Sequence, residues 1–298
     1  MVNHNYCGSE TEMTTGTPAP EKTVLITGTS SGIGLAAAVA AAQAGWNTVA
    51  TMRDTSRADA LLAAADAAGV AGRIQVRQLD VTDPDSVEAA VAGVIADHGR
   101  LDAVVNNAGA GHVGTLEQET IADVRQVLEV NFFGVLHVTK AALPHLRATG
   151  GRVVTVTSVG GVVGQPFNEA YCAAKFAVEG FMESLAPVAA TTGVSVTVVE
   201  PGAVASEFVS NVGFDPAVID AAGPYAPALR AYLERTRNTF ANAAQPPADA
   251  AAPIIEALSG DRPAFRIQTS EAARTFAGTK LGDLDGSSVL ALTGSWVA

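Results

Sequence analysis

Short apolar, β-branched runs alternate with longer Ala- and Leu-rich segments along the first two thirds of the chain. Residues 23–27 (TVLIT) show the pattern most clearly, and a run without polar positions is typical of a strand buried on both faces of a sheet. The pattern predicts strands at 23–27, 47–52, 74–79, 101–105, 153–157 and 194–199, with helices at 35–44, 56–68, 82–98, 116–147 and 170–190. Repeated alternation of strand and helix predicts an α/β fold with one doubly wound parallel sheet.

The pattern changes at both ends of this region. Residues 1–22 have no apolar periodicity, and we expect a disordered leader ahead of a single domain spanning 23–298. After residue 206 the chain becomes rich in Pro, Ala and Gly, and residues 207–247 are predicted to form a lid over the substrate, with a helix at 226–241. A helix at 248–258 and a strand-like stretch at 261–267 follow, and the tail from 279 has no clear pattern.

Composition narrows the classes of partner. A formal net charge of -12 argues against nucleic acid, and no uncharged apolar run is long enough to span a membrane. The amino terminus has neither the cationic start nor the apolar core of a secretory signal. The cysteines, Cys7 and Cys172, cannot form a disulfide framework, and they indicate a reducing compartment. We therefore expect a cytoplasmic protein. The five histidines show no metal-ligand spacing, and no metal is expected.

A glycine-rich turn follows the first strand and opens the first helix. Its spacing is Gly28-x3-Gly32-x-Gly34, which differs from the common G-x-G-x-x-G fingerprint. Glycines let a backbone turn sharply and approach a pyrophosphate, which then lies at the amino terminus of a helix. A tight turn without a ligand is the alternative, but the flanking strand and helix favour a dinucleotide.

The end of the second strand bears on the choice of cofactor. The position that carries an acidic residue in NAD-binding proteins is Met52, and Arg53 follows it. A guanidinium suits a 2′-phosphate, and the hydroxyls of Thr29, Ser30 and Ser31 would add donors. Asp54 could instead neutralise Arg53 or contact the ribose. We predict a preference for NADP(H) over NAD(H).

The catalytic candidate is the segment from Ser158 to Lys175. Tyr171 and Lys175 are one helical turn apart, and Ser158 follows a predicted strand, at the sheet edge where parallel sheets bind ligands. A nearby cation lowers the pKa of a phenol toward the range in which proton transfer is efficient. The serine hydroxyl would hold the substrate oxygen. An incidental YxxxK pair on an amphipathic helix is the alternative.

Taken in order, these motifs resemble those of the short-chain dehydrogenase/reductase family over about residues 23–205. The motifs are Thr27-Gly28-x3-Gly32-x-Gly34, Asp80-Val81, Asn106-Asn107-Ala108-Gly109, Asn131, Ser158, Tyr171-x3-Lys175 and Pro201-Gly202. The resemblance implies a Rossmann-type fold and an NAD(P)-dependent oxidoreductase, EC 1.1.1.-, in which Tyr171 is the general acid/base. Lys175 would lower the pKa of Tyr171, Ser158 would orient the substrate, and Asn131 would support a proton-returning water chain. The implied cofactor contacts are Gly28, Ser30, Ser31, Gly32, Ile33, Gly34, Arg53, Asp80, Val81, Asn107, Ala108, Gly109, Tyr171, Lys175, Pro201, Gly202, Val204 and Ser206.

Residues 157–187 are more similar to one branch of this family, which contains 17β-hydroxysteroid dehydrogenase type 1 and the retinol dehydrogenases. That resemblance implies a bulky, mostly apolar alcohol, ketone or aldehyde as the substrate. The candidate substrate contacts are Ser158, Gly160, Gln165, Tyr171 and Phe208. His112, three residues past Gly109, either overhangs this site or is a solvated loop histidine. The long helices at 116–147 and 170–190 are the faces through which the family associates, which implies a homodimer or homotetramer.

Two other functions stay open at this point. A 3-oxoacyl-thioester reductase or polyketide-type ketoreductase would use the same catalytic residues. A nucleotide-binding regulatory protein without turnover would need the fold but not all four of Asn131, Ser158, Tyr171 and Lys175. The intact set therefore favours an enzyme.

Overall fold

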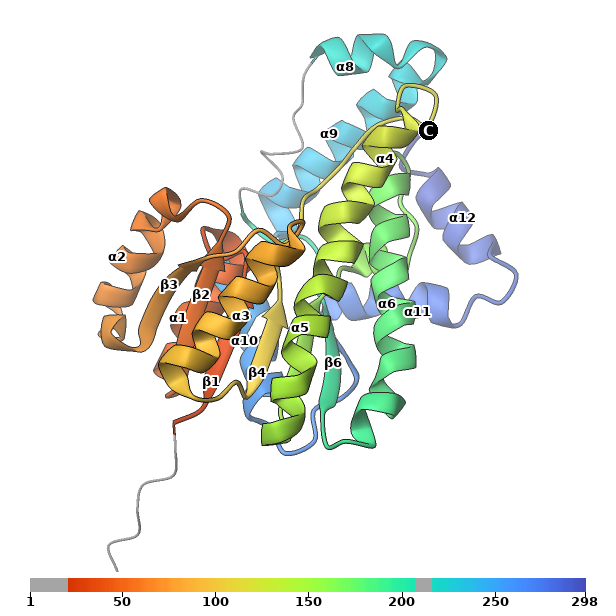
Figure 1. The fold of residues 1–298 in the computed structure, drawn as a ribbon. Coiled ribbons are helices and arrows are strands. Elements are labelled where there is room, and N and C mark those ends of the chain that lie inside the picture. Colours follow the sequence, from red (N-terminus) through yellow and green to blue (C-terminus); the bar gives the residue numbers. More distant parts are fainter. Residues whose placement is uncertain (1–20, 207–215) are drawn as a thin grey trace, which may run out of the picture.

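The computed structural model describes residues 21–206 and 216–298. Within this part of the chain a seven-stranded sheet forms the centre of the molecule (Figure 1), and every neighbouring pair of strands is parallel. The strand order is β3-β2-β1-β4-β5-β6-β7. The strands are β1 (Thr23–Thr27), β2 (Asn47–Met52), β3 (Ile74–Gln78), β4 (Ala103–Asn106), β5 (Arg152–Val156), β6 (Ser195–Glu200) and β7 (Arg266–Gln268). The predicted doubly wound, Rossmann-type sheet is confirmed, and its order reverses between β1 and β4.

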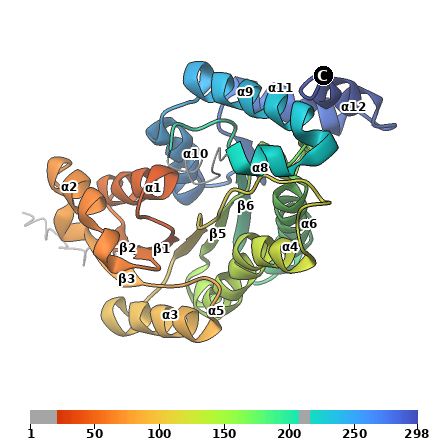
Figure 2. The same ribbon diagram turned by 90° about the horizontal axis from the view of Figure 1, so that it is seen from above.

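Helices cover both faces of the sheet, as Figure 2 shows. One face carries α1 (Gly32–Gln43), α2 (Asp59–Ala67) and α10 (Pro247–Ser259), and the other carries α3 (Pro84–His98), α5 (Gly134–Thr149) and α6 (Glu169–Ala190). Alanines of α1 pack with Ile254 and Leu258 of α10 in one buried cluster. Val178 and Met182 of α6 join α3 and α5 in a second cluster. Apolar strands are thus buried on both faces, as their sequences predict.

The predicted helix at 116–147 is divided in the structure. It begins only at α4 (Ile121–Leu128), where Thr120 and Asp123 form a reciprocal capping box. A π-helical turn, η3 (Glu129–Phe133), separates α4 from α5. The predicted bend near Gly134 is therefore a change of helix type, and such π-helical turns are frequent at functional sites. Asn131 lies in this turn.

The carboxyl-terminal third contains α8 (Pro216–Ala221), α9 (Ala226–Ala243), α11 (Glu271–Leu281) and α12 (Ser287–Gly294). The helix predicted at 226–241 is present as α9, and the strand predicted at 261–267 is limited to β7. The sequence pattern missed α11 and α12. Leu229 and Tyr232 of α9 pack with Trp296 and with Phe167, which lies just before α6. The predicted lid residues 207–215, among them Phe208, and most of the leader (1–20) lie outside the described residues.

The length and apolarity of the helices bear on membrane association. Within residues 21–206 and 216–298 the structure shows no helix that is both long and apolar enough to cross a membrane.

Candidate active site

The glycine-rich turn joins β1 to α1 at the carboxyl edge of the sheet. Gly28 and Gly32 have φ angles of 71° and 57°, which lie in the left-handed region that favours glycine. A Cβ on Gly28 would lie 2.8 Å from Ala108 Cα, and one on Gly34 would overlap Gly28 O and Asn107 Nδ2. The turn therefore has no room for side chains at these positions, and its backbone is free to approach a ligand.

The amino terminus of α1 suits an anion. Ser31 is the N-cap residue, but its side chain makes no capping hydrogen bond, and the first turn of α1 carries no acidic side chain. The backbone N–H groups there are therefore not satisfied by a side-chain cap, and the helix dipole favours negative charge. Gly28, Gly32 and Gly34 surround this end of the helix, so the residues present fit a dinucleotide pyrophosphate. Ser206 lies beside it, with its Cβ 3.2 Å from a Cβ placed on Gly32.

Residues after β2 lie where the adenosine ribose would be bound in this fold. Arg53 is exposed, and Asp54 accepts hydrogen bonds from Ser56 N and Ser56 Oγ at 3.0 and 2.7 Å. These bonds, followed by the weaker attraction of Arg57 and Arg53, hold the pKa of Asp54 below its usual value. Asp54 thus caps its own turn rather than pairing closely with Arg53. Thr29 is not a phosphate donor in this structure, because it is fully buried and donates to Thr51 O.

The adenine contacts implied by the resemblance, Asp80 and Val81, follow β3. Asp80 Oδ1 accepts from Thr82 N at 3.0 Å and from Thr82 Oγ1 at 2.8 Å, which fixes this turn. Val81 O is 3.0 Å from His137 Nδ1 of α5, and the Val81 side chain packs against Gly134. His137 was not predicted as a site residue, and its contact with the segment of Asp80 and Val81 appears only in the structure.

The floor of the site is the segment after β4. Thr27 Oγ1 accepts hydrogen bonds from the backbone N–H groups of Asn107 and Ala108, each at 3.0 Å. Asn107 Nδ2 donates to Thr27 O and Gly28 O at 2.9 and 3.0 Å. The segment is therefore tied directly to the glycine-rich turn, across the point where the strand order reverses.

Asn131 and Lys175 come together at Gly109. A Cβ placed on Gly109 would be 2.9 Å from Asn131 Oδ1 and 3.5 Å from Lys175 Nζ. Asn131 is fully buried, and its side-chain amide exchanges hydrogen bonds of 3.1 and 3.0 Å with the backbone of Ala110. Lys175 Nζ donates to Val156 O at 3.2 Å. The π-helical turn thus brings Asn131 to the same point as the lysine of α6.

Ser158, Gln165 and Tyr171 meet at Gly160. A Cβ on Gly160 would lie 3.3 Å from Ser158 Oγ, Gln165 Nε2 and Tyr171 Cε1 alike. Ser158 begins a short 3-10 turn, η4 (Val159–Gly161), and its Oγ accepts from Gly160 N at 2.9 Å. A side-chain hydrogen bond also joins Ser158 to Tyr171. The predicted substrate contacts within the described residues therefore form one cluster.

Burial dominates the electrostatics of the catalytic pair. It raises the pKa of Tyr171 above its usual value, and the Ser158 hydrogen bond only partly opposes this. It lowers the pKa of Lys175 to about 8, while the Glu179 carboxylate acts in the opposite direction. Lys175 Nζ lies 5.9 Å from the Tyr171 ring centroid. The expected lowering of the Tyr171 pKa is not found, because desolvation of the phenolate outweighs the stabilising contacts.

The segment after β6 closes the site on its remaining side. Pro201 O accepts from Val159 N at 2.9 Å, and Val204 forms a parallel bridge with Gln245. Ala205 N donates to Gln245 O at 2.9 Å. Gly202 faces α11, with Ala273 Cβ 3.5 Å from a Cβ placed on it. Gln245 thus anchors the end of the predicted lid to the implied nicotinamide pocket. It was not among the residues predicted from the sequence.

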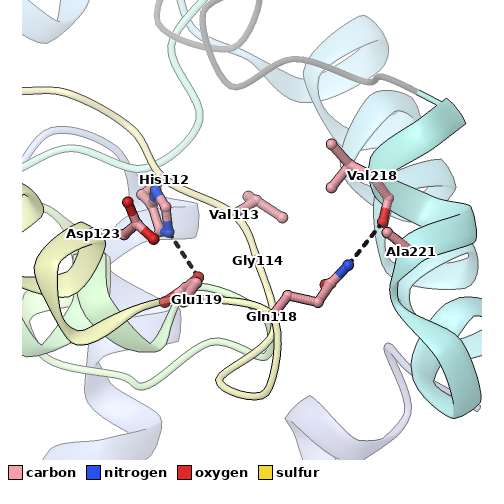
Figure 3. Close-up of a pocket in the computed structure, with 8 residues that line it drawn as sticks. All are labelled: His112, Val113, Gly114, Gln118, Glu119, Asp123, Val218 and Ala221. Atoms are coloured by element: carbon pink, nitrogen blue, oxygen red, sulfur yellow. Dashed lines mark hydrogen bonds and ion pairs between the residues drawn. The ribbon is translucent and has the colours of Figure 1, made fainter.

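A cavity of about 410 Å³ lies between the segment 112–119 and α8 (Figure 3). His112 Nε2 is 2.7 Å from Glu119 Oε1, and Gln118 Nε2 donates to Val218 O of α8 at 3.2 Å. Ala110, the partner of Asn131, lies just before this segment, and Gly114 N donates to Phe167 O. His112 is therefore a loop residue that is paired with Glu119 and lines this cavity.

The parallel sheet, the glycine-rich turn and the Ser-Tyr-Lys-Asn cluster define a nicotinamide-dependent dehydrogenase. The profile of the short chain dehydrogenase family matches residues 22–216. The chain belongs to the short-chain dehydrogenase/reductase family, and it is an NAD(P)-dependent oxidoreductase related to the retinol and hydroxysteroid dehydrogenases. The predicted family and enzyme class are confirmed.

Individual relatives resemble most of the chain. Human retinol dehydrogenase 8 is 37% identical over 277 residues, which cover 90% of this chain and 88% of the relative. Human 17-beta-hydroxysteroid dehydrogenase type 1 is 39% identical over 271 residues, with coverages of 89% and 82%. The crystal structure of a short-chain dehydrogenase from Streptomyces avermitilis has a TM-score of 0.72 at 34% identity, with coverages of 93% and 96%.

One similar structure contains a cofactor analogue. An alcohol dehydrogenase from the archaeon Thermococcus sibiricus, complexed with 5-hydroxy-NADP, has a TM-score of 0.68 at 25% identity. The match covers 83% of this chain and 95% of that chain.

Proposed function

We propose that this protein is an NADP(H)-preferring oxidoreductase that interconverts an alcohol and its ketone or aldehyde on a mostly apolar substrate. The observation that carries the proposal is the convergence of Asn131 and Lys175 on Gly109 and of Ser158 and Tyr171 on Gly160. Both glycines lie at the carboxyl edge of the sheet, next to a turn that fits a dinucleotide. A regulatory nucleotide-binding protein would not need this set of side chains in one place.

The nicotinamide cofactor, when bound, supplies or accepts the hydride. The protein handles the proton and the orientation of the substrate. Ser158 Oγ is the donor for the substrate oxygen, and the Tyr171 hydroxyl transfers the proton to or from that oxygen. Burial raises the pKa of Tyr171, so the phenol keeps its proton at neutral pH, and nearby positive charge is needed to make it a stronger acid toward a carbonyl oxygen. Lys175 contributes positive charge beside Tyr171, and Asn131 holds the backbone of Ala110 against the site.

The relatives and the lid support the proposed substrate class. The relatives at 37% and 39% identity are named for retinol and for a 17-beta-hydroxysteroid, which are bulky and mostly apolar. In this chain Phe167 joins Leu229 and Tyr232 of α9 in an apolar cluster beside the catalytic helix. Gln165 and the His112–Glu119 pair add polar groups, so we propose an apolar substrate that also carries a second polar group.

A substrate panel tests this proposal. We expect NADPH oxidation with steroid ketones or retinoid and aliphatic aldehydes, and weaker oxidation with acyl thioesters, because an apolar wall rejects a charged carrier. The measurement is the decrease of NADPH absorbance with each substrate class. Preferential turnover of a 3-oxoacyl thioester would favour a ketoreductase, and nucleotide binding without any turnover would favour a regulatory protein.

The cofactor preference has its own prediction. Arg53→Ala should lower kcat/KM for NADPH by at least about tenfold and leave kcat/KM for NADH nearly unchanged, because a guanidinium contact to a 2′-phosphate is worth roughly 1.5–3 kcal/mol. Steady-state kinetics with both cofactors measures the change. Arg262→Ala removes an equally exposed arginine after α10 and is the matched control for lost positive charge. An NADH preference in the unmodified protein would contradict the assignment.

We also propose a homodimer or homotetramer formed through α4, α5 and α6. These helices and the η3 turn leave large apolar side chains exposed: Ile121 at 62%, Phe133 at 42%, Phe176 at 39%, Phe181 at 40% and Val188 at 64%. Exposed apolar side chains that share one surface favour association. The proposal places the helix of Tyr171 and Lys175 next to the interface. We also propose a cytoplasmic location, which the absence of a disulfide framework from Cys7 and Cys172 supports.

A further inference from the structure

A row of buried charges runs from β7 to the catalytic helix, outside the site described above. Glu179 of α6 is 4% exposed, and Glu200 at the end of β6 is fully buried. Arg266 of β7 bridges them, with Nη2 3.3 Å from Glu179 Oε2 and Nε 2.6 Å from Glu200 Oε1. Taking such charges out of water costs several kcal/mol per ion. A role at the adjacent catalytic site would account for their presence.

Glu179 lies one helical turn beyond Lys175, as Lys175 lies one turn beyond Tyr171. All of these α6 residues are buried, so they lie on the inner face of the helix. Arg266, Glu179 and Lys175 thus form a sequence of alternating positive, negative and positive charges that ends at the active site. The Glu179 carboxylate opposes the effect of burial on the pKa of Lys175.

Glu179 also contacts the segment that carries Ser158. Its Oε1 accepts from Thr157 Oγ1 at 2.5 Å, and Thr157 directly precedes Ser158. A Cβ on Gly161, at the end of the η4 turn, would lie 3.1 Å from both Glu179 Cγ and Lys175 O. One side chain therefore links the end of β5, the turn after Ser158 and the catalytic lysine.

Two carboxyls share Arg266, and their surroundings differ. Burial raises the pKa of Glu200 to about 7, so it is the group that accepts a proton near neutrality. Burial also raises the pKa of Glu179, but the Thr157 hydroxyl and the Arg266 guanidinium both stabilise its anion. Gln268 and Arg266 stabilise the Glu200 anion in the same way, but burial outweighs them there. Glu183, also on α6, is two-thirds exposed and lies 3.4 Å from Arg266.

Among the other elements packed against α6, β6 places the Glu200 carboxyl near Glu179, where both contact Arg266. The η4 turn consists of Val159, Gly160 and Gly161, which are uncharged. On α4 and η3 the titratable groups are Asp123, Arg125 and Glu129; the first two are exposed, and Asp123 is bonded to Thr120. Arg266 is thus the opposite charge that stabilises the Glu179 anion, and Glu179 in turn raises the pKa of Lys175 against the effect of burial.

We propose that Glu179 is a positioning residue of the catalytic pair, which keeps Lys175 in its ammonium form at neutral pH and holds the turn that carries Ser158. Its effect on catalysis rests on the proposed function, whereas its effect on the charge of Lys175 does not. Removing a nearby anion lowers the pKa of every neighbouring titratable group, because the ammonium loses its attraction and the phenolate loses its repulsion. A merely structural role would give no such signed shift.

The test is an NMR titration of protein labelled with ¹³C at lysine Cε. The chain has four lysines (Lys22, Lys140, Lys175 and Lys280), and Lys175→Met identifies the catalytic resonance. In Glu179→Gln the Lys175 midpoint should fall by at least about one pH unit. Glu179→Asp keeps the negative charge, so its Lys175 midpoint should stay close to that of the unmodified protein. Glu183→Gln removes the exposed carboxylate that also contacts Arg266, and it should move the midpoint little.

A second variant allows the same test if Glu179→Gln does not fold. Glu179→Met has similar volume and no polar group that needs a partner, and it should give the same downward shift. In an active preparation the pH profile of kcat/KM should move to lower pH in the same variants. A Lys175 midpoint in Glu179→Gln and Glu179→Met that matches Glu183→Gln would overturn the inference. If the unmodified protein turned over none of the substrates, while the Glu179 variants still showed the Lys175 shift, the proposed function alone would be overturned.

Discussion

Tyr171→Phe should lower kcat by at least about a thousandfold, because it removes the hydroxyl that transfers the proton and leaves no other donor at that position. Ser158 would still hold the substrate oxygen, and the glycine-rich turn would be untouched. NADPH should therefore bind as before, which fluorescence titration measures alongside the steady-state rate. The lost hydrogen bond to Ser158 should cost only about 1 kcal/mol of folding free energy.

Tyr232→Phe is the matched control for this prediction. Tyr232 is also a buried phenol, 4% exposed, and its hydroxyl accepts a hydrogen bond of 2.7 Å from Asn168 Nδ2. Its loss removes a buried, bonded hydroxyl of the same kind without removing a proton donor, so kcat should fall by less than about tenfold. A Tyr171→Phe enzyme that keeps as much activity as Tyr232→Phe would show that another group carries the proton.

The pattern of apolar runs predicted most of the sheet because strands buried on both faces leave a continuous signal in the sequence. Cofactor and catalytic candidates followed from motifs at the ends of those strands, and the structure brings Asn131, Ser158, Tyr171 and Lys175 to the same edge. Local sequence could not reveal the π-helical turn around Asn131, since a change from one helix type to another leaves no distinct spacing. The capping box that starts α4 at Thr120 was readable but was hidden within a longer apolar pattern.

Features that depend on distant partners were the ones missed. In the sequence Glu179 is one polar position on an amphipathic helix. Only the fold brings Arg266, 87 residues later, into contact with it. Gln245 gains its role only from the bridge to Val204. The helices α11 and α12 are short, and packing such as the stacking of Phe276 on Trp296 stabilises them more than their own patterns do. The raised pKa of Tyr171 likewise follows from burial that no local motif encodes.

Gly34→Ala should abolish tight nucleotide binding, because the added Cβ would overlap Gly28 O and Asn107 Nδ2, and neither has room to move freely. Asn107 Nδ2 is already bonded to Gly28 O at 3.0 Å, so the turn and the floor of the site would be forced apart together. We expect a loss of about 1–3 kcal/mol of folding free energy from overpacking. NADPH affinity should fall at least about tenfold, which corresponds to 1.4 kcal/mol.

Gly278→Ala separates this steric effect from the general effect of replacing a helical glycine. Gly278 lies in α11, and a Cβ there would meet nothing within 4 Å. The substitution should raise the free energy of unfolding by about 0.5–1 kcal/mol, since alanine loses less conformational entropy than glycine in a helix. Thermal unfolding should show a loss of stability for Gly34→Ala and a gain for Gly278→Ala. NADPH titration should show a lower affinity for Gly34→Ala alone. If Gly34→Ala bound NADPH as tightly as Gly278→Ala, the close contact between the turn and the β4 floor would not be what shapes the pyrophosphate site.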